Sequence, residues 1–570
     1  MFIKLRQFIT SRYGIPVIVF TTYLLLNHGI TGPAYLSDEI GYLDKAATIA
    51  GSLVHLSTSW FGGYSLMISP AFMLSANIHI EWLMVLILNA LMWAGSAALL
   101  QYMLRTIYPK TEPRTIWFVT IGTMAYPSWL SMSGYAFSTS GFVLVFLAAL
   151  ATLLKSKLTN RGWLIIAGLL SGYLCWIHPL GFLLVGLLGL LFIFQSVLRK
   201  KLIYSIVAVL GALIGISYLL VIEPIFEHIM SGSITNDVHY TNTLTTLLSA
   251  ATGIHFWLQA GLLLLGLLLF VIVATFGTAL YGATTIISQL FKHKDQWKAQ
   301  LLDVNFVIKI LSVLLVILVL FSTALSFAAS GQLRIDQWVY GRYTDMYLLP
   351  LIAFGLLATW RFKQALIAAG AVIITGIILS LATNAQNTSF VYDNKVNIQG
   401  LWPMFVASVF HVDYYWLWAI LGGIGIAIVG LMGTKKYKPF LLLLFIPITL
   451  ADVGNYLYHH TVINQHSTVS SLYQDIKNSY KETDCIGFTP VPDSNERFNL
   501  YSYYLHGYDI RQISFAQWLR DNCSGPYLTY TLPPSLPDGV QVTGQEVSTK
   551  LLLISHVGTG SATVTPTLFR

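Results

Sequence analysis

The chain has 570 residues, of which 55% are hydrophobic and only 10% are charged, and its mean hydropathy is +0.68. This composition excludes an ordinary soluble globular protein. The formal net charge of +8 does not indicate nucleic-acid binding, because the basic residues before the tail lie in short clusters between apolar runs. Such clusters are typical of the cytoplasmic loops of membrane proteins.

Apolar runs recur from residue 15 to about residue 454. A span needs roughly 20 apolar residues to cross a bilayer core of about 30 Å, and the absence of strand-like alternation favours helices over a barrel. We therefore expect an α-helical polytopic membrane protein with about 13 transmembrane helices. The expected spans are 14–30, 82–104, 115–133, 137–154, 162–178, 180–198, 202–222, 255–280, 306–328, 345–360, 364–383, 413–432 and 439–456. The region 254–291 is ambiguous, since it could hold one tilted span and an interfacial helix.

An odd number of spans puts the N-terminus in the cytoplasm and the C-terminus outside. Every basic cluster before the tail then falls on the cytoplasmic side, as the positive-inside rule requires. The first apolar segment is interpreted as an uncleaved helix rather than a signal peptide, because no small-x-small cleavage site follows it cleanly.

The composition changes after about residue 457, which divides the chain into a transmembrane bundle (1–456) and an extracytoplasmic domain (457–570). The domain is predicted to be a small α/β unit. Its expected helices and strands are 468–482 (helix), 485–490 (strand), 515–522 (helix), 527–532 (strand) and 550–557 (strand). Cys485 and Cys523 lie in this domain, and an oxidising compartment favours a disulfide between them over two free thiols.

The first outside loop, 31–81, contains the acidic sequence Ser37-Asp38-Glu39. Charge is costly near hydrocarbon, so a carboxylate pair at the membrane edge suggests a function. Asp38 or Glu39 could take the proton of an acceptor hydroxyl in a glycosyl transfer. The alternative is a helix start, with Ser37 as N-cap and the two acids in the first turn; both interpretations can hold together.

Two arginines, Arg334 and Arg342, lie in the outside loop 329–344, against the topological bias. A guanidinium group binds phosphate oxygens bidentately, so these residues could hold the phosphate of a lipid carrier. The alternative is a structural ion pair with Asp336 or Asp345. Arg342 is the better candidate, since Arg342 and Tyr343 directly precede the next span.

His178 ends the fifth expected span, where its imidazole could hydrogen-bond a phosphate or a sugar; a lone histidine at a helix end is more often a packing or capping residue. Asp237 and His239 form at most half of a metal site, because two ligands do not make one.

Four short motifs, in this order, resemble those of the superfamily C (GT-C) membrane glycosyltransferases, which use polyprenyl-phosphate sugars as donors. They are SDEIGYL after the first span, GYSLMISP in the same loop, CWIHPLGFLL, and VYGRYTDMYLLPLI. The resemblance extends over the whole chain in outline and includes the outside C-terminal domain. It implies a bacterial plasma (inner) membrane location, a donor phosphate near Arg342, Asp38 as the catalytic carboxylate and inversion at the anomeric carbon.

The chain departs from the family at one point. Many members carry a second acid in the next outside loop that helps to hold a divalent metal, but here that loop reads SMSGYAFSTSG. We therefore expect no cofactor and a metal-independent mechanism, unless Glu223, Asp237 or Asp336 substitutes.

The sequence as a whole predicts a glycosyltransferase acting on a hydroxyl of a cell-envelope glycan or lipid-linked acceptor, on the extracytoplasmic face. Asp38 would be the base, supported by Glu39. The donor phosphate and lipid would be held by Arg342, Arg334, His178 and Tyr343. The alternatives are a glycan polymerase or ligase with a diphosphate-linked donor, and a lipid or solute transporter. Transport is disfavoured because the acids cluster at the outer face.

Overall fold

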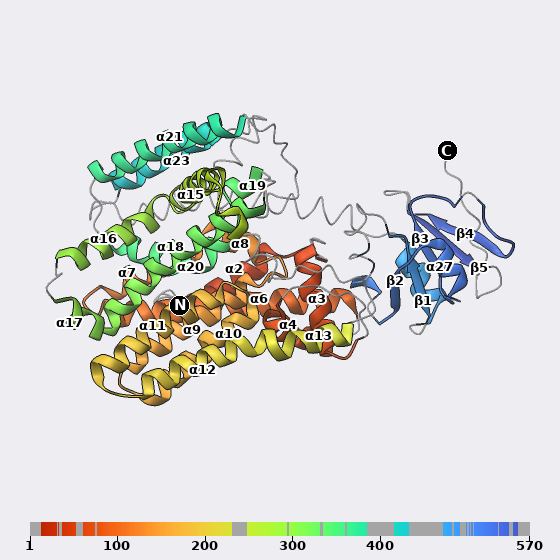
Figure 1. Cartoon of the computed structure of the whole chain (residues 1–570), viewed down its shortest axis with the longest axis horizontal. Coiled ribbons are helices and arrows are strands. Elements are labelled where there is room, and N and C mark those ends of the chain that lie inside the picture. Colours follow the sequence, from red (N-terminus) through yellow and green to blue (C-terminus); the bar gives the residue numbers. More distant parts are fainter. Residues whose placement is uncertain are drawn as a thin grey trace, which may run out of the picture.

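The structure is a computed structural model, and every structural statement below refers to the residues that it describes. These are residues 13–30, 32–33, 37–52, 61–74, 77–230, 248–292, 296–330, 335–358, 362–384, 415–432, 471–481, 484–490, 498, 501, 503–505, 507–521, 523–533, 535–545 and 551–556. Figure 1 shows a large helical bundle at one end of the molecule and a small sheet domain at the other.

The bundle follows the expected spans closely. Its first half comprises α2 (Gly14–Leu26), α3 (Ser37–Ile49), α4 (Gly62–Ile68), α5 (Pro70–Leu74), α6 (Ile78–Ile107), α7 (Pro113–Met124), α8 (Pro127–Met132), α9 (Thr139–Ser156), α10 (Arg161–Ile177) and α11 (Gly181–Arg199). Its second half comprises α12 (Ile203–Ser217), the π-helix η1 (Tyr218–Ile222), α13 (Glu223–Met230), α15 (Ile254–Ala274), α16 (Thr278–Lys292), α17 (Trp297–Leu302), α18 (Val304–Ser330), α19 (Ile335–Trp338), α20 (Arg342–Leu357), α21 (Phe362–Asn384) and α23 (Tyr415–Met432).

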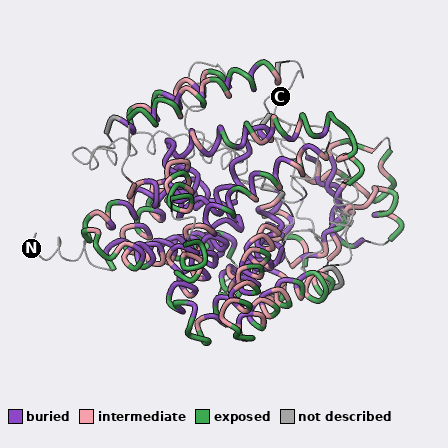
Figure 2. Tube along the Cα trace, turned by 60° about the vertical axis from the view of Figure 1, so that its left-hand side comes forward, coloured by how far each residue is buried: buried purple, intermediate pink, exposed green. Residues whose placement is uncertain are grey.

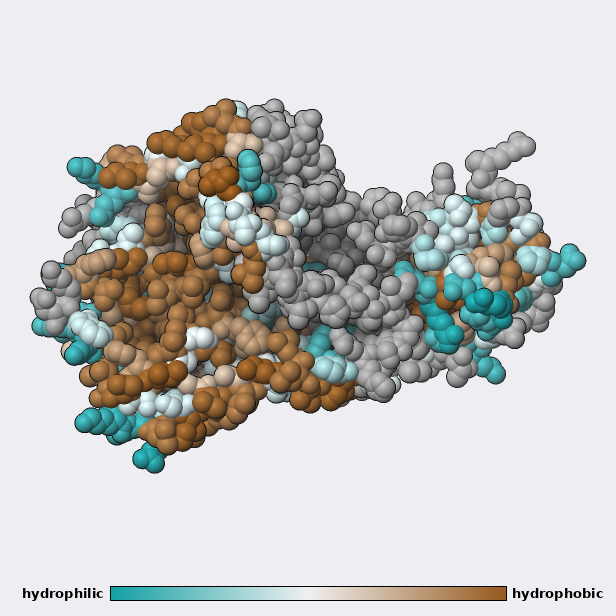
Figure 3. Space-filling view, viewed as in Figure 1, coloured by the Kyte–Doolittle hydropathy of each residue, from teal (hydrophilic) through white to brown (hydrophobic). Residues whose placement is uncertain are grey.

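Within the described residues, seven helices are long and apolar enough to cross a membrane, and shorter apolar helices accompany them. Buried residues fill the interior of the bundle (Figure 2), while apolar side chains cover its flank (Figure 3). An apolar flank around a packed interior is the arrangement of a helical membrane protein. The protein is therefore a multi-pass membrane protein. The exact helix count stays a prediction, because the expected span 439–456 lies outside the described residues.

Two expected spans are interrupted. Pro127 separates α7 from α8, since proline cannot continue a helix hydrogen-bonded to the preceding turn. Phe276 and Gly277 both have positive φ angles (51° and 74°) and separate α15 from α16. The left-handed conformation ends a helix, so the ambiguous stretch after residue 254 is two helices.

The two ends of the bundle differ. The short α3, α4 and α13 lie at the end that faces the sheet domain (Figure 1). The turn between α11 and α12 and the region around α17 lie at the opposite end, where hydrophilic side chains gather on the visible face (Figure 3). The acidic pair of α3 therefore lies at one end of the bundle. The basic clusters of the α11–α12 turn and of the region around α17 lie at the other end.

The C-terminal part is an α/β domain, as predicted. It contains α25 (Ser471–Ser479), β1 (Cys485–Phe488), β2 (Asp509–Gln512), α27 (Phe515–Arg520), β3 (Tyr527–Thr529), β4 (Val540–Gln545) and β5 (Leu552–His556). The five strands form one sheet in the order β2-β1-β3-β5-β4. β1 is parallel to β2 and β3, and β5 is antiparallel to β3 and β4. The predicted boundary at residue 457 lies outside the described residues.

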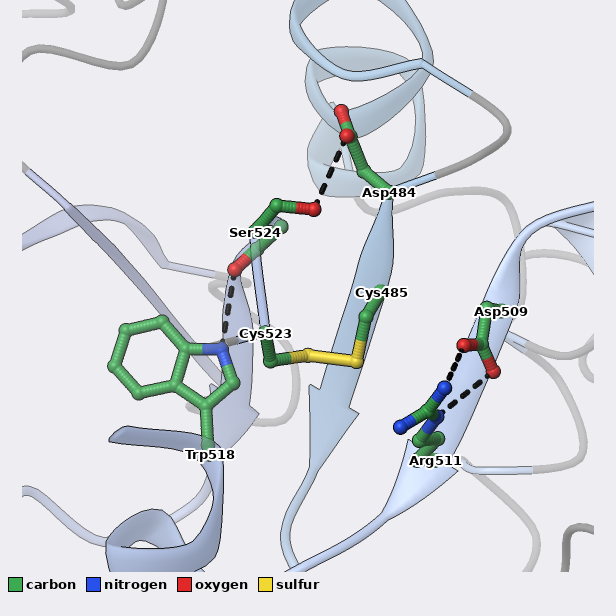
Figure 4. The surroundings of a disulfide bond; sticks show 8 residues. Asp484, Cys485, Asp509, Arg511, Trp518, Cys523 and Ser524 are labelled. Carbon is green, nitrogen blue, oxygen red and sulfur yellow. Dashed lines mark hydrogen bonds and ion pairs between the residues drawn. A yellow bond between two sulfur atoms is a disulfide. The ribbon is translucent and has the colours of Figure 1, made fainter. Parts of the chain in front are cut away.

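A disulfide joins Cys485 at the start of β1 to Cys523, which confirms the pairing favoured by the sequence (Figure 4). Beside it, the Ser524 hydroxyl donates to Asp484 at 3.1 Å, and the Trp518 indole donates to the Gly525 carbonyl at 3.1 Å. These contacts fix the chain after α27 against the start of β1.

Candidate functional site

The acidic pair lies in the first turn of α3, as the helix-start interpretation expects. The Asp38 side chain is 20% exposed, whereas Glu39 is buried. Carboxylates in a first turn are stabilised by the positive end of the helix dipole. Helix position alone does not account for either side chain, because each makes a specific contact with a segment far away in the chain.

Asp38 forms an ion pair with Arg342, with 2.6 Å between Oδ2 and Nη1. Arg342 is the first residue of α20, and its side chain is 6% exposed. The sequence assigned these two residues to separate roles and did not predict their contact. Of the ion-pair partners that the sequence offered as an alternative, Asp345 instead accepts hydrogen bonds from Tyr126, at 2.7 Å, and from Ser128.

The Arg342 guanidinium also lies over an aromatic ring. Its central carbon is 4.1 Å from the ring centroid of Phe137, and Phe137 stacks in turn on Tyr135 at 5.1 Å. A guanidinium above an aromatic face gains a cation–π interaction that strengthens when water is excluded. Arg342 Nε is buried and has no hydrogen-bond partner among the described residues. The guanidinium thus has a buried N–H donor that Asp38 does not use.

Glu39 is held by the segment 133–138, which lies between α8 and α9. Its Oε1 accepts a hydrogen bond of 2.9 Å from the backbone N–H of Ala136. A backbone N–H that points at a buried carboxylate stabilises the ionised form. The uncharged segment 133–138 therefore supplies a donor to Glu39 and, through Phe137, a ring to Arg342.

His178 lies at the end of α10, 7% exposed. Its Nδ1 accepts from the Leu180 N–H at 3.2 Å, so Nδ1 carries no proton. The imidazole is therefore neutral, and its Nε2 carries the proton and can act as a donor.

Tyr343 completes the aromatic surroundings of Arg342. Its ring centroid is 5.3 Å from that of His178 and 4.7 Å from that of Tyr340. Tyr42 of α3 donates to the Ser138 hydroxyl at 3.0 Å. Five of the predicted site residues, Asp38, Glu39, His178, Arg342 and Tyr343, thus meet at one end of the bundle. The sixth, Arg334, lies outside the described residues.

The possible metal ligands that the structure describes do not assemble into a site. In the described part of the chain, no three His, Cys, Asp or Glu side chains gather as metal ligands. Glu223, one of the possible substitutes, is held by Lys45, whose Nζ lies 3.1 Å from both carboxylate oxygens, and Glu223 also accepts from Tyr218. Asp237 lies outside the described residues. Metal-independent chemistry stays a prediction.

A further acid of α3, Asp44, is 1% exposed, and neither of its carboxylate oxygens has a hydrogen-bond partner among the described residues. Burial raises the pKa of Asp44 well above its usual range. Burial likewise raises the pKa of Tyr503, and nearby negative charge adds to the shift. The acidic groups involved are Glu81, Glu39 and Asp44. Tyr503 of the C-terminal domain therefore lies near the acids of α3 and of the first turn of α6.

No protein-family model matches the sequence, and no curated protein sequence matches it. Among solved structures, the chain is similar to ArnT from Cupriavidus metallidurans bound to undecaprenyl phosphate, with a TM-score of 0.56 and 13% identity, over 96% of this chain and 98% of ArnT. The apo form of ArnT gives a TM-score of 0.55 and 14% identity, over 94% and 97% of the two chains. The chain has the ArnT fold.

The fold shared with ArnT is a membrane helical bundle followed by a C-terminal domain, which is the architecture that the sequence predicted. An oligosaccharyltransferase from Archaeoglobus fulgidus is also similar, with a TM-score of 0.42 and 9% identity over 90% of this chain and 66% of its own.

The sequence missed three contributors to the site: the Ala136 N–H, the Phe137 ring and Tyr42. None of them carries a charge. The one available signal was the length of the uncharged loop SMSGYAFSTSG between two spans, whose small and aromatic residues suit close packing at a membrane surface.

Proposed function

We propose that the protein is an integral membrane glycosyltransferase that moves a sugar from a polyprenyl-phosphate donor to a hydroxyl of a cell-envelope glycan or lipid-linked acceptor. The observation that carries this proposal is the contact between Asp38 and Arg342 at the end of the bundle that faces the C-terminal domain. It joins a carboxylate suited to take a proton and a cation suited to hold a phosphate. The undecaprenyl phosphate bound to ArnT supports the lipid-linked donor.

The donor phosphate would lie against Arg342. The buried Nε–H without a partner suits a phosphate oxygen, because a guanidinium can serve two anions with its five donors. The Nε2–H of neutral His178 would add a second donor, and Tyr343 would cover the headgroup. Arg334 would act with Arg342. This arrangement stabilises the phosphate as the sugar leaves it.

In the reaction, the acceptor oxygen attacks the anomeric carbon from the face opposite the phosphate. The new carbon–oxygen bond forms as the bond to the phosphate oxygen breaks, and the phosphate keeps the electron pair. The acceptor proton passes to Asp38. This direct displacement inverts the anomeric carbon. Glu39 would hold the acceptor side in place from its bond to the Ala136 N–H.

We further propose that the protein lies in a bacterial inner membrane with its N-terminus in the cytoplasm. The positive-inside pattern supports this orientation. The site and the C-terminal domain would then both face away from the cytoplasm, where the disulfide is stable.

The proposal is tested by a transfer assay with purified protein, a panel of polyprenyl-phosphate sugars and a crude envelope acceptor. Asp38→Asn should lower kcat at least about 100-fold, because it removes the base.

Arg342→Lys should raise the donor KM about 10- to 100-fold, because an ammonium lacks the planar fork.

The matched controls come from ion pairs of the C-terminal domain, where the substituted side chains, Arg511 at 47% and Asp521 at 43%, are more exposed than those of the site. Asp521→Asn and Arg511→Lys alter the pairs Arg520–Asp521 and Arg511–Asp509 and should leave both constants within about twofold. Transfer that survives Asp38→Asn at the wild-type rate would move the base elsewhere, with Glu39 the next residue to test. A wild-type protein that transfers no sugar from any donor would count against the enzyme proposal.

A further inference from the structure

Asn89 places a polar amide in the interior of the long apolar helix α6, where it is fully buried. Its side chain makes four hydrogen bonds. Oδ1 accepts from Tyr64 at 2.9 Å and from Ser140 at 2.8 Å. Nδ2 donates to the backbone carbonyls of Ser133, at 3.4 Å, and Tyr135, at 2.9 Å. A buried amide is tolerated in a membrane helix when its groups are bonded in this way.

The two carbonyls that Asn89 binds lie next to the residues that reach the site. Ala136, whose N–H donates to Glu39, follows Tyr135 directly. Phe137, which lies under Arg342, stacks on the Tyr135 ring. The Asn89 amide thus fixes the backbone from which both contacts arise. The segment 133–138 contains no charged side chain of its own.

We propose that Asn89 is a positioning residue of the site. It acts through the segment 133–138 and sets where the Ala136 N–H and the Phe137 ring stand relative to Glu39 and Arg342. A displacement of about 1 Å at a catalytic group can cost about 100-fold in rate. The effect on transfer rests on the proposed function, whereas the effect on the segment does not.

Two variants separate the role of the Asn89 Oδ1 acceptor from that of the Nδ2 donor. Asn89→Asp keeps oxygens that accept from Tyr64 and Ser140 but loses the amide donors to the segment. Asn89→Leu removes both the acceptor and the donor with a side chain of similar volume. The matched control is Ser96→Ala on the same helix, because Ser96 is equally buried and, among the described residues, its hydroxyl bonds to the Met92 carbonyl of its own helix alone.

The first measurement is hydrogen exchange of the peptide that covers 130–141 in the purified full-length protein. We expect the Ala136 amide to exchange at least about 10-fold faster in both Asn89 variants, because its carbonyl neighbours lose their donors. Ser96→Ala should exchange as the wild type does. Unchanged exchange in a folded Asn89→Asp protein would overturn the proposal, whatever the protein catalyses.

The second measurement is a double-mutant cycle in the transfer assay with Phe137→Leu, read as the donor KM. If Asn89 acts through the segment, Asn89→Asp should raise KM about 10-fold in the wild type and less than about twofold when Phe137 is already replaced. If the two substitutions raise the donor KM by independent factors, so that the double variant shows their product, the positioning role is overturned. A wild type without transfer would contradict the proposed function, and the exchange experiment would then still decide the role of Asn89.

Discussion

Asp44 differs from the two acids that precede it on α3, because its buried carboxylate has no hydrogen-bond partner among the described residues. Burial disfavours the charged form, which raises the pKa of Asp44 above its value of about 3.9 in an unfolded chain. The folded protein therefore binds this proton more tightly than the unfolded chain does. Its contribution to stability is complete below the unfolded pKa and is lost as the pH rises towards the folded pKa.

Asp44→Asn removes this titration. We expect the variant to melt on the order of 2 °C higher than the wild type at pH 8, with a smaller difference at pH 4. Thermal unfolding in detergent between these pH values measures the effect. The control is Asp538→Asn at an exposed turn of the C-terminal domain. If the melting temperatures of the wild type and Asp44→Asn differ by the same amount at every pH, the prediction is wrong. Asp44 would then not have a raised pKa in the folded protein.

The residue types of the site were predictable, but their contacts were not. A carboxylate pair and an arginine close to apolar spans are unusual enough to stand out in the sequence, and the structure brings Asp38 and Arg342 together. The Asp38–Arg342 pair joins segments about 300 positions apart, and no local pattern encodes such a contact. The Ala136 N–H could not be predicted at all, since every residue except proline has one.

The start of α20 is positioned by a close contact with α15. A Cβ atom at Gly341 would lie 1.8 Å from Cζ of Phe270, whose ring is fully buried. Gly341 directly precedes Arg342, so this contact brings the arginine up against the bundle. The helix cannot approach α15 in this way with a larger residue at that position.

Gly341→Ala should therefore displace Arg342 and lower kcat/KM for transfer at least about 10-fold. Gly370→Ala on α21 is the matched control, because its added Cβ meets no atom within 4 Å. Steady-state kinetics of the two variants, with melting temperatures, make the comparison. Equal activity would mean that Phe270 moves aside without disturbing the arginine.

At the level of elements, the long apolar runs predicted the long helices of the bundle, with ends within a few residues of the observed ones. The interruptions were harder to predict. The break at Phe276 depends on a left-handed backbone at a bulky residue, which is rare. The strands β2 and β4 were missed because they carry polar residues such as Arg511 and Gln541, whose strand signal is weak.

The whole molecule divides into an apolar bundle and a disulfide-bonded domain, and this division predicts an orientation. The bridge joins cysteines separated by 38 positions, so its loss should cost the domain about 3 to 4 kcal/mol. In intact cells, a membrane-impermeant thiol reagent added after mild reduction should label Cys485 and Cys523. Buried Cys175 provides the internal control, because it should react only after denaturation.

If Cys485 and Cys523 are labelled only in permeabilised cells, the predicted orientation is wrong. The Cys485→Ser/Cys523→Ser double variant serves as the blank for the reagent. The same variant should show faster limited proteolysis of the domain, with the bundle left intact.

The pairing of Asp38 with Arg342 also bears on how the protein is made. The ribosome synthesises the aspartate early and the arginine on the order of tens of seconds later, at typical elongation rates. During that interval the carboxylate has entered the membrane region without its cation. The site can therefore close only after α20 has been inserted, and a chain that stops before α20 carries an acid whose partner never arrives.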